Sequence, residues 1–233
     1  MIDRKEIKLK SKNLCKTAKP SLITMGLIYT LLSGVIGALS SAVLGGNITQ
    51  QDFNRLLYAY NDGNYDVIIK IVEKLRPTPS GSLISALLSV VMWIVAAGFV
   101  IFIMNTVRGT GAAYGNILDG FGITGRVLIL NLIEGIITAL LFCLLVVPGI
   151  IYVYSHRLST YIMIDHPEMS VLECLKESKR LMKGHKWELF VMDLSFLGWL
   201  LLSAVFPVAG IFVSPYTQTA YFIYYQNLIH EAH

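Results

Sequence analysis

Long apolar segments separated by short charged ones dominate this sequence. The runs from Ser21 to Leu44 and from about Ser82 to Asn105 each match the length of about 20 helical residues that crosses a hydrocarbon layer roughly 30 Å thick. Charged residues make up 15% of the chain, compared with about 25% in soluble domains. The sequence therefore predicts an all-α protein, a polytopic transmembrane helix bundle, and excludes an ordinary soluble domain.

The apolar segments recur often enough to predict about six spans. The run from Val127 to Ile164 is too long for one crossing and is interrupted at Val147-Pro148-Gly149, where a turn is favoured. One long kinked helix is the alternative. Basic residues in the next segment prefer the cytoplasm, which requires an even number of crossings before them and favours the turn. The expected spans are about 21–44, 82–105, 127–146, 149–164, 188–205 and 208–227.

Charge at the ends of the chain predicts its orientation. Residues 1–20 form a strongly basic segment that should stay in the cytoplasm. The first apolar run lacks a signal-peptide cleavage site, so it should be retained as a span. With six spans the C-terminus is cytoplasmic as well. We expect a multi-pass protein of the cell membrane, with residues 21–233 forming a single transmembrane domain.

Two short amphipathic helices are expected in the outer loop, residues 45–81. Thr49 and Asp52 have the spacing of a capping box, and apolar residues follow at helical spacing. A second apolar stripe should end at the prolines. These helices would form a packed cap on the bundle or lie on the outer membrane surface; a lid over a substrate is the alternative. The two stripes are Phe53, Leu56, Leu57 and Tyr60, then Val67, Ile68, Ile71, Val72 and Leu75, followed by Pro77 and Pro79.

An amphipathic cytoplasmic helix is expected at residues 169–184. Ser170 and Glu173 form a second capping box, Gly184 ends the helix, and Trp187 marks the membrane interface before the next span. Its basic residues are candidates for contact with anionic lipid, although anchoring of the topology explains them equally well. They are Lys176, Lys179, Arg180, Lys183 and Lys186. The glycine-rich segment 107–126 matches no nucleotide-binding motif, and we expect turns there.

Several short pieces of sequence carry a family resemblance. They are LDGF (118–121), VPGII (147–151), YIMIDHPEMS (161–170), ESKRLMKGHKWELF (177–190), DLSFLGWLLLS (193–203) and SPY (214–216). The block from Gly115 to Leu228 thereby resembles the bacterial integral membrane proteins catalogued as domain of unknown function nine-seven-five. That family is distantly similar to the membrane portion of some glycerophosphodiester phosphodiesterases, which lacks their catalytic residues. The resemblance implies a six-span bundle and gives no position a catalytic role.

Three ionisable residues lie inside the expected spans: Glu134, Arg157 and Asp193. Such residues are energetically costly in a membrane, usually face the bundle interior, and are functional candidates by default. They would either neutralise one another across the bundle or form a site for a substrate, an ion or a lipid headgroup. Asn131 and His156 extend this candidate cluster, each with ordinary helix packing as the alternative.

Catalytic and metal-binding signals are weak. His230, Glu231 and His233 do not have the spacing of a zinc-protease helix, and the three cysteines are too far apart for a zinc motif or a disulfide framework. We therefore expect no catalytic residue, no metal and no cofactor. The net charge of +4 is explained by membrane orientation, so no nucleic-acid partner is expected.

Three functions from different classes follow from these observations. We favour a non-enzymatic membrane protein that binds or handles lipid or an amphipathic peptide. The alternatives are a small transporter or channel that uses the intramembrane charges, and a lipid-modifying membrane enzyme, which would need a nucleophile or metal at headgroup depth. The expected partners are membrane lipids, with a membrane-protein partner or a second copy of the chain as further candidates.

Overall fold

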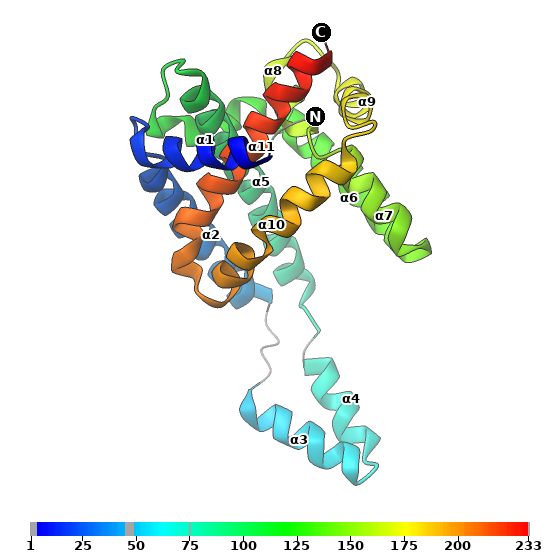
Figure 1. The fold of residues 1–233 in the computed structure, drawn as a ribbon. Helices are drawn as coiled ribbons and strands as arrows, with labels where there is room; N and C mark the ends of the chain where they lie inside the picture. Colours follow the sequence, from blue (N-terminus) through cyan, green and yellow to red (C-terminus); the bar gives the residue numbers. More distant parts are fainter. Residues whose placement is uncertain (1–3, 45–48, 75, 233) are drawn as a thin grey trace. The chain divides into compact units, whose positions relative to one another are not determined.

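A computed structural model describes residues 4–44, 49–74 and 76–232 (Figure 1). These residues are almost entirely helical and include no strand, as the sequence predicts. The chain divides into two compact units. One consists of residues 33–92, and the other consists of the residues before and after that segment.

The smaller unit contains the predicted pair of outer helices, α3 (Gln50–Asn61) and α4 (Tyr65–Lys74). The capping box is confirmed: the Thr49 hydroxyl accepts from the Asp52 backbone N–H, and the Asp52 carboxylate accepts from the Thr49 N–H. Asp52 also forms an ion pair with Lys74 at 2.8 Å, which joins the two helices. The Asp52 carboxylate accepts hydrogen bonds from the Lys74 ammonium, the Thr49 hydroxyl and the Thr49 backbone N–H, and these bonds lower the pKa of Asp52 to about 2. Leu75, the last residue of the predicted second stripe, lies outside the described residues.

Helix α4 ends at Lys74, before the prolines that were predicted to close off the second stripe. Pro79 is the first residue of α5 (Pro79–Arg108), which therefore begins before the predicted Ser82 and ends beyond Asn105. Proline suits this position because the first helical N–H has no partner within the helix and the fixed φ of proline is already helical. The other long helix that enters the smaller unit is α2 (Leu22–Leu44). Ser40 of α2 and Ser85 of α5 share a hydrogen bond of 2.6 Å.

The larger unit is built around α11 (Gly210–Ala232) and the second half of α5. These two helices supply many of its largest buried side chains: Phe99, Phe102, Ile103 and Met104 from α5, and Tyr221, Phe222, Ile223, Tyr224, Tyr225 and Leu228 from α11. The start of α2 also packs closely on α11. A side chain at Gly26 would collide with the backbone of Ile211 and the ring of Pro215.

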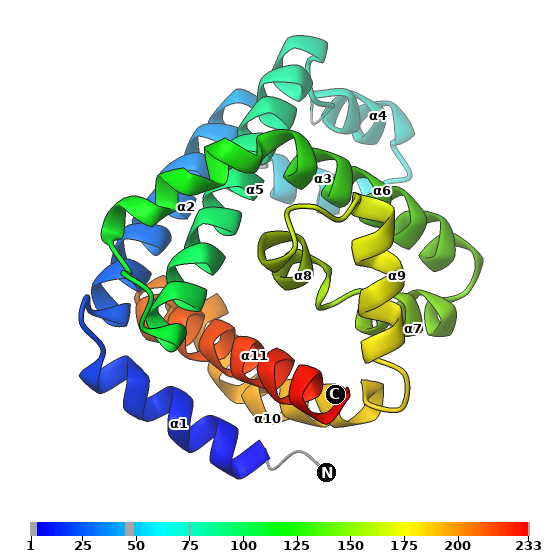
Figure 2. The same ribbon diagram turned by 90° about the horizontal axis from the view of Figure 1, so that it is seen from above.

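The basic N-terminal segment is itself a helix, α1 (Arg4–Thr17), which the sequence reasoning did not predict. Figures 1 and 2 show α1 lying along α11. Ile7 and Ser11 are buried in this contact, and the Lys8 ammonium lies 4.9 Å from the centre of the Phe196 ring in α10. The segment therefore belongs to the packed unit.

The glycine-rich segment forms a 3₁₀ helix, η1 (Tyr114–Ile123), where we expected only turns. Two glycines let its backbone touch that of α5. A side chain at Gly98 would collide with Ile117 of η1, and a side chain at Gly120 would collide with Ile94 of α5. Glycine is required at both positions because the two backbones are in contact. The segment continues directly into α6 (Thr124–Leu144).

The chain then turns back at Leu145, and α7 (Val146–Ser155) packs alongside α6 (Figure 2). Gly149 lies against the Phe142 ring, in a space that no larger residue would fit without a shift. The segment 127–164 is therefore a helical hairpin rather than one long kinked helix. Its second arm is interrupted, since α8 (Ser159–Asp165) begins only after a break at residues 156–158.

The predicted cytoplasmic helix is α9 (Val171–Leu181), with the capping box between Ser170 and Glu173 in place. Gly184, with φ at 91°, lies in the turn that follows. The turn leads to α10 (Lys186–Val205), which matches the predicted fifth span closely. A short 3₁₀ helix, η2 (Pro207–Ala209), connects α10 to α11, and these two helices pack together.

Among the described residues, four helical segments are long and apolar enough to cross a membrane: Leu22–Leu44, Pro79–Arg108, Tyr114–Leu144 and Lys186–Val205. They correspond to the first, second, third and fifth predicted spans. The predicted fourth span is divided between α7 and α8, which are too short, and the sixth corresponds to α11, whose Thr, Gln and Tyr residues make it less apolar. The count of about six spans stays a prediction.

Candidate functional site

Arg157 lies at the break between α7 and α8. The break is stabilised locally: the Ser159 hydroxyl donates to the carbonyl of His156 at 2.7 Å, and the His156 ring lies 4.0 Å from that of Tyr152. Two cavities within the larger unit have Arg157 and Thr160 in common. We call these two cavities together the Arg157 hollow.

The first cavity of the Arg157 hollow has a volume of about 180 Å³ and lies among α5, α6, α8 and α11. Asn131, Tyr161 and Gln218 are the other polar residues in its wall. The Asn131 amide donates to the Val127 carbonyl at 2.8 Å, and the Tyr161 hydroxyl donates to Gln218 at 2.8 Å. The hydrogen-bonding capacity of these three side chains is thus partly used within the protein. Among the described residues that line this cavity, Arg157 is the one that carries a charge.

The second cavity has a volume of about 140 Å³ and is lined by Glu134, Thr138, Tyr152 and His156 in addition to Arg157. Glu134 Oε1 and the Tyr152 hydroxyl are both buried and have no hydrogen-bond partner among the described residues. Buried polar groups are nearly always hydrogen-bonded in proteins, so two orphans in the same cavity wall call for an explanation. A bound polar group would supply the missing partners.

Asp193 lies outside the Arg157 hollow but is connected to it through Tyr221. The Asp193 carboxylate accepts hydrogen bonds from the hydroxyls of Tyr154 at 2.9 Å and Tyr221 at 2.7 Å. The Arg157 guanidinium lies 4.8 Å from the centre of the Tyr221 ring. Asp193 is thus held by two helices, α7 and α11, and its oxygens are already occupied.

The sequence suggested that Arg157, Glu134 and Asp193 would neutralise one another or form a site. Among the described residues, no ion pair joins Arg157 to either carboxylate. Arg157 also keeps an exposed surface, although protein surrounds it on most sides. The geometry is that of a cation open to a ligand, with the four predicted residues Asn131, Glu134, His156 and Arg157 brought together around the hollow.

Comparison with known proteins supplies the family. A family model described as "Protein of unknown function (DUF975)" matches residues 1–232. The chain belongs to this family. The match also includes the N-terminal half, where the sequence pieces that carried the resemblance were absent. Neither the curated proteins nor the solved structures contain a match, so the distant similarity to the membrane portion of glycerophosphodiester phosphodiesterases stays a prediction.

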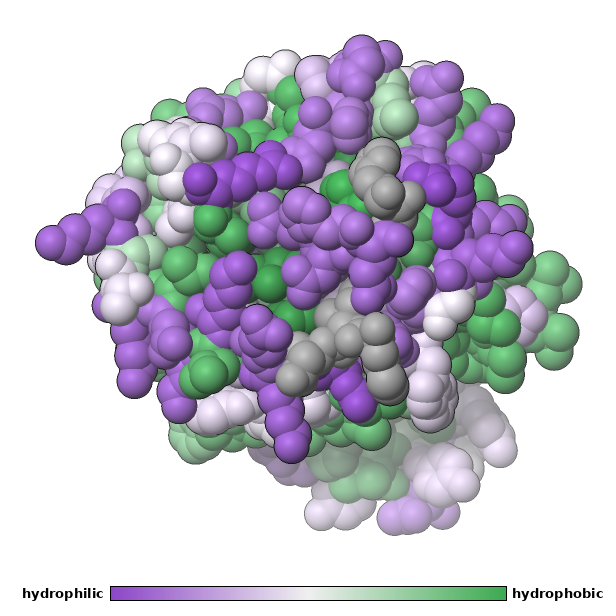
Figure 3. Space-filling model, turned by 45° about the horizontal axis from the view of Figure 1, so that its top comes forward, coloured by the Kyte–Doolittle hydropathy of each residue, from purple (hydrophilic) through white to green (hydrophobic). Residues whose placement is uncertain are grey.

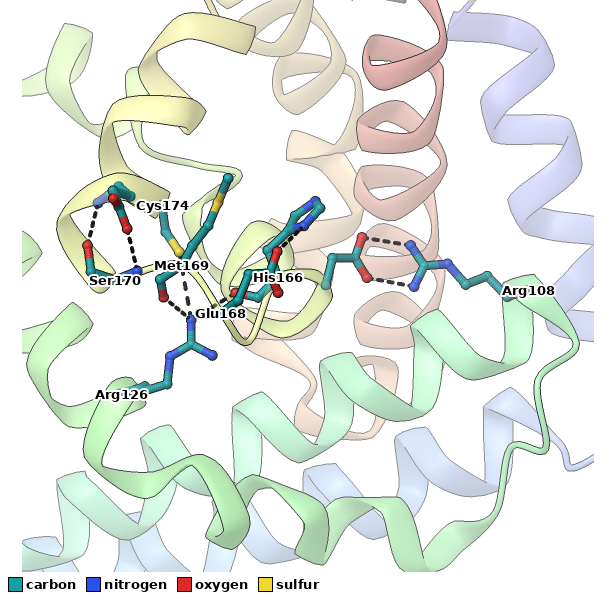
Figure 4. Close-up of polar contacts among 9 residues, drawn as sticks. Arg108, Arg126, His166, Glu168, Met169, Ser170 and Cys174 are labelled. Atoms are coloured by element: carbon teal, nitrogen blue, oxygen red, sulfur yellow. Dashed lines mark hydrogen bonds and ion pairs between the residues drawn. The ribbon is translucent and has the colours of Figure 1, made fainter.

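Two arginines hold the end of α8 and the loop between α8 and α9 (Figure 4). The YIMIDHPEMS piece of the family resemblance covers most of α8 and this loop. Arg108, the last residue of α5, forms a bidentate ion pair with Asp165 at 2.6 and 2.7 Å. Arg126 of α6 donates to the carbonyls of His166 at 3.1 Å and Met169 at 2.8 Å. Sequence reasoning missed this arrangement; the available signal was a basic residue at the end of each neighbouring apolar segment.

The basic residues predicted to contact anionic lipid are on or just after α9. Lys176, Lys179, Arg180 and Lys183 are exposed, and Lys186 is half-buried. Arg180 forms a bidentate ion pair with Glu177, and a hydrogen bond from the Ser170 backbone N–H lowers the pKa of Glu173. Both acidic side chains are therefore engaged locally, and the exposed lysines dominate the charge of this helix.

Metal ligands are not clustered in the part of the chain that the structure describes, which contains no group of three or more His, Cys, Asp or Glu side chains able to hold an ion. Of the residues considered in the C-terminal tail, His233 lies outside the described residues.

Proposed function

We propose that this chain is a multi-pass protein of the cell membrane that binds a lipid, or an amphipathic peptide, by an anionic group at Arg157. The observation that carries the proposal is the position of this guanidinium, which faces two cavities without an ion-pair partner among the described residues. A cation in a site of low dielectric constant requires a counter-charge. The Asp193 carboxylate attracts Arg157 electrostatically but accepts its hydrogen bonds from two tyrosines, so a phosphate or carboxylate of a ligand would supply the direct partner of the guanidinium.

The second cavity supports a headgroup rather than a simple anion. Beside Arg157 it presents a carboxylate oxygen of Glu134 and the hydroxyl of Tyr152, and neither atom has a hydrogen-bond partner within the described ranges. Arginine binds phosphate and carboxylate through paired N–H donors, whereas a carboxylate accepts from hydroxyl or amine groups. A ligand that carries both an anionic group and hydrogen-bond donors satisfies all three side chains, as the headgroups of many phospholipids do.

The distribution of charge supports the proposed orientation, with both termini in the cytoplasm. Helix α9 and the C-terminal end of α11 lie at the same end of the larger unit, and the basic helix α1 lies alongside α11 (Figures 1 and 2). Figure 3 shows that this end is covered largely by hydrophilic residues. A basic layer of this kind is typical of the cytoplasmic side of a membrane protein. The exposed lysines of α9 would then contact anionic lipids at that surface.

The exposed side chains of the α3–α4 pair support its predicted role as an outer-loop element at a membrane surface. Several of its apolar and aromatic side chains are exposed within the described residues, namely Phe53, Leu57, Tyr58, Tyr60 and Tyr65. Amphipathic helices with exposed aromatic residues are typical of the bilayer interface, where a ring can be partly apolar and partly hydrated. We propose that this pair lies on the outer surface and contacts lipid there.

A transporter is the second candidate function, and the interrupted helix favours it. In many transporters the substrate site is formed where a membrane helix is broken, because the broken backbone offers polar groups within the bilayer. The break at residues 156–158 places Arg157 in this setting. The same ligand would then be moved rather than only held.

Native mass spectrometry of the detergent-purified full chain tests the principal proposal. Wild type should retain a lipid or peptide of defined mass, and Arg157→Ala should lose it. Arg157→Lys should keep part of the binding because it keeps the charge but not the paired donors. Arg76→Ala is the matched control, since it removes an exposed arginine that lines neither cavity.

Thermal unfolding of each variant shows whether the protein remains folded. Retention of the same ligand by folded Arg157→Ala contradicts the proposal. Reconstitution in vesicles then separates the two functions: movement of the ligand between leaflets or compartments, lost in Arg157→Ala, supports a transporter, and binding without movement supports a lipid-handling protein.

A further inference from the structure

A separate groove, which shares no lining residue with the Arg157 hollow, lies where α1 meets the other helices of the larger unit. It has a volume of about 490 Å³ and is lined by residues from α1, α2, α10 and α11. This volume falls within the range of about 300–1,000 Å³ that is usual for small-molecule sites. We call it the α1 groove, and its lining includes Lys12, Cys15, Lys16, Trp199, Phe212 and Tyr216.

The groove has one charged wall and one apolar wall. Lys12 and Lys16 are one turn apart on α1, so both side chains project from the same face of that helix. Both residues are exposed, and neither forms an ion pair within the part of the chain that the structure describes. Trp199 and Phe212, on α10 and α11, supply large exposed apolar surfaces opposite them. The groove therefore combines two cations with a surface suited to hydrocarbon.

Among the described residues that line the groove, none is acidic. Burial raises the pKa of Cys15 to about 11, so its thiol is neutral at physiological pH and adds no negative charge. The position of α1 is fixed, because Ile7 and Ser11 are buried against the neighbouring helices. The two lysines are therefore presented by a packed helix rather than by a loose terminus.

We propose that the α1 groove is a binding site for an anionic phospholipid. The phosphate group would lie between Lys12 and Lys16, and part of an acyl chain would lie on Trp199 and Phe212. Charge complementarity selects an anionic headgroup over a neutral one, and the apolar wall selects a lipid over a soluble phosphate. The occupant is a bilayer lipid, because a membrane protein is surrounded by such molecules and the groove offers both parts of one. This site does not depend on the Arg157 hollow.

The experiment compares phosphatidylglycerol with phosphatidylcholine, each titrated into the detergent-purified full chain and counted by native mass spectrometry. A lysine near a membrane surface contributes about 1 kcal/mol to anionic lipid binding, which corresponds to roughly fivefold in affinity. Lys12→Ala and Lys16→Ala should each weaken phosphatidylglycerol binding about fivefold, and the double variant about 30-fold. Binding of phosphatidylcholine should change little.

Three controls isolate the site. Lys10→Ala removes one charge from α1 at a position that does not line the groove, and it should leave phosphatidylglycerol binding unchanged. Ile23→Trp fills the groove without altering charge, so it should weaken the binding of both lipids. Arg157→Ala should have no effect on the affinity of this site, which separates it from the Arg157 hollow.

The proposal is overturned if the double variant binds phosphatidylglycerol within twofold of wild type. It is also overturned if Lys10→Ala weakens binding as much as Lys12→Ala, because the attraction would then come from the whole helix rather than from the groove. If the double variant instead changes the mass of the complex by a whole chain, the groove is an interface between copies and the lipid assignment is wrong.

Discussion

Replacing Arg108 by alanine should destabilise the protein far more than replacing Arg180. The two arginines form ion pairs of nearly equal geometry: Arg108 with Asp165 at 2.6 and 2.7 Å, and Arg180 with Glu177 at 2.8 and 2.6 Å. Their settings differ. The Arg108 pair connects the end of α5 to the end of α8, whereas the Arg180 pair lies within one helix, three residues apart. The comparison therefore isolates the effects of burial and connectivity.

The magnitude follows from the exposure of each pair. The Asp165 side chain is 10% exposed and that of Arg108 is 35% exposed. Removing one partner of a buried pair costs about 3–5 kcal/mol, and the partial exposure of Arg108 lowers our expectation to about 2–3 kcal/mol. The side chains of Arg180 and Glu177 are 62% and 27% exposed, and exposed pairs of this kind contribute about 0.3–0.5 kcal/mol.

Thermal unfolding in detergent, followed by tryptophan fluorescence, measures the difference. For a chain of this size, about 2 kcal/mol corresponds to a decrease in Tm of about 4–8 °C. A double-mutant cycle with Asp165→Ala should give a coupling energy above about 1 kcal/mol. If Arg108→Ala lowers the Tm no more than Arg180→Ala does, burial of the pair does not determine its contribution and the reasoning is refuted.

Three further outcomes are expected. Gly98→Ala should lower the Tm strongly, because the added methyl group would overpack the contact with η1 and cost about 1–3 kcal/mol of stability. Gly135→Ala should leave the Tm unchanged, because its methyl group would enter open space. Equal Tm values for the two variants would contradict the backbone contact at Gly98. The α3–α4 pair should be lost in acid, because the pKa of Asp52 is lowered to about 2: its carboxylate stabilises the pair above about pH 4 and ceases to do so as the pH falls towards 2. Hydrogen exchange of residues 49–74 measures this loss, and Lys74→Ala should move it to higher pH. Arg126→Ala should increase hydrogen exchange in residues 165–171, because two loop carbonyls lose their donor; unchanged exchange there contradicts the assignment.

Features encoded by neighbouring residues could be predicted from the sequence. Both capping boxes, Thr49 with Asp52 and Ser170 with Glu173, were predicted correctly because each requires only two side chains three residues apart and the backbone between them. The turn after α9 was predicted for a similar reason, since Gly184 adopts a positive φ that other residues disfavour. The residues of the Arg157 hollow could be selected as candidates because charged residues in apolar segments are rare and usually face the bundle interior.

Features that depend on distant residues could not be predicted. The segment 149–164 was predicted as one span, but the structure interrupts it at residues 156–158, where the Ser159 hydroxyl donates to the His156 carbonyl. Gly98 and Gly120 allow the backbones of α5 and η1 to touch, and neither local sequence indicates that the two segments are neighbours. Helix α1 likewise has the sequence of a charged tail. Ile7 becomes a core residue through the contact of α1 with α11, which the local sequence does not indicate.

The relation between hydropathy and burial explains why the core was hard to locate. In the most apolar stretches of α2 and α10 only 17% of residues are buried within the protein, and in that of the η1–α6 segment only 11%. Helix α11 is less apolar, yet Tyr224, Tyr225 and Thr219 are among its completely buried side chains. Helix α5 has the most apolar stretch of all, and half of that stretch is buried, so hydropathy alone does not locate the core. In a membrane, lipid would solvate the exposed apolar faces of α2, α10 and the η1–α6 segment, and the interior is left to side chains that pack closely and hydrogen-bond one another. Helix α11 bonds to Asp193 through Tyr221 and lines the first cavity through Gln218, so it connects the proposed ligand site to the core.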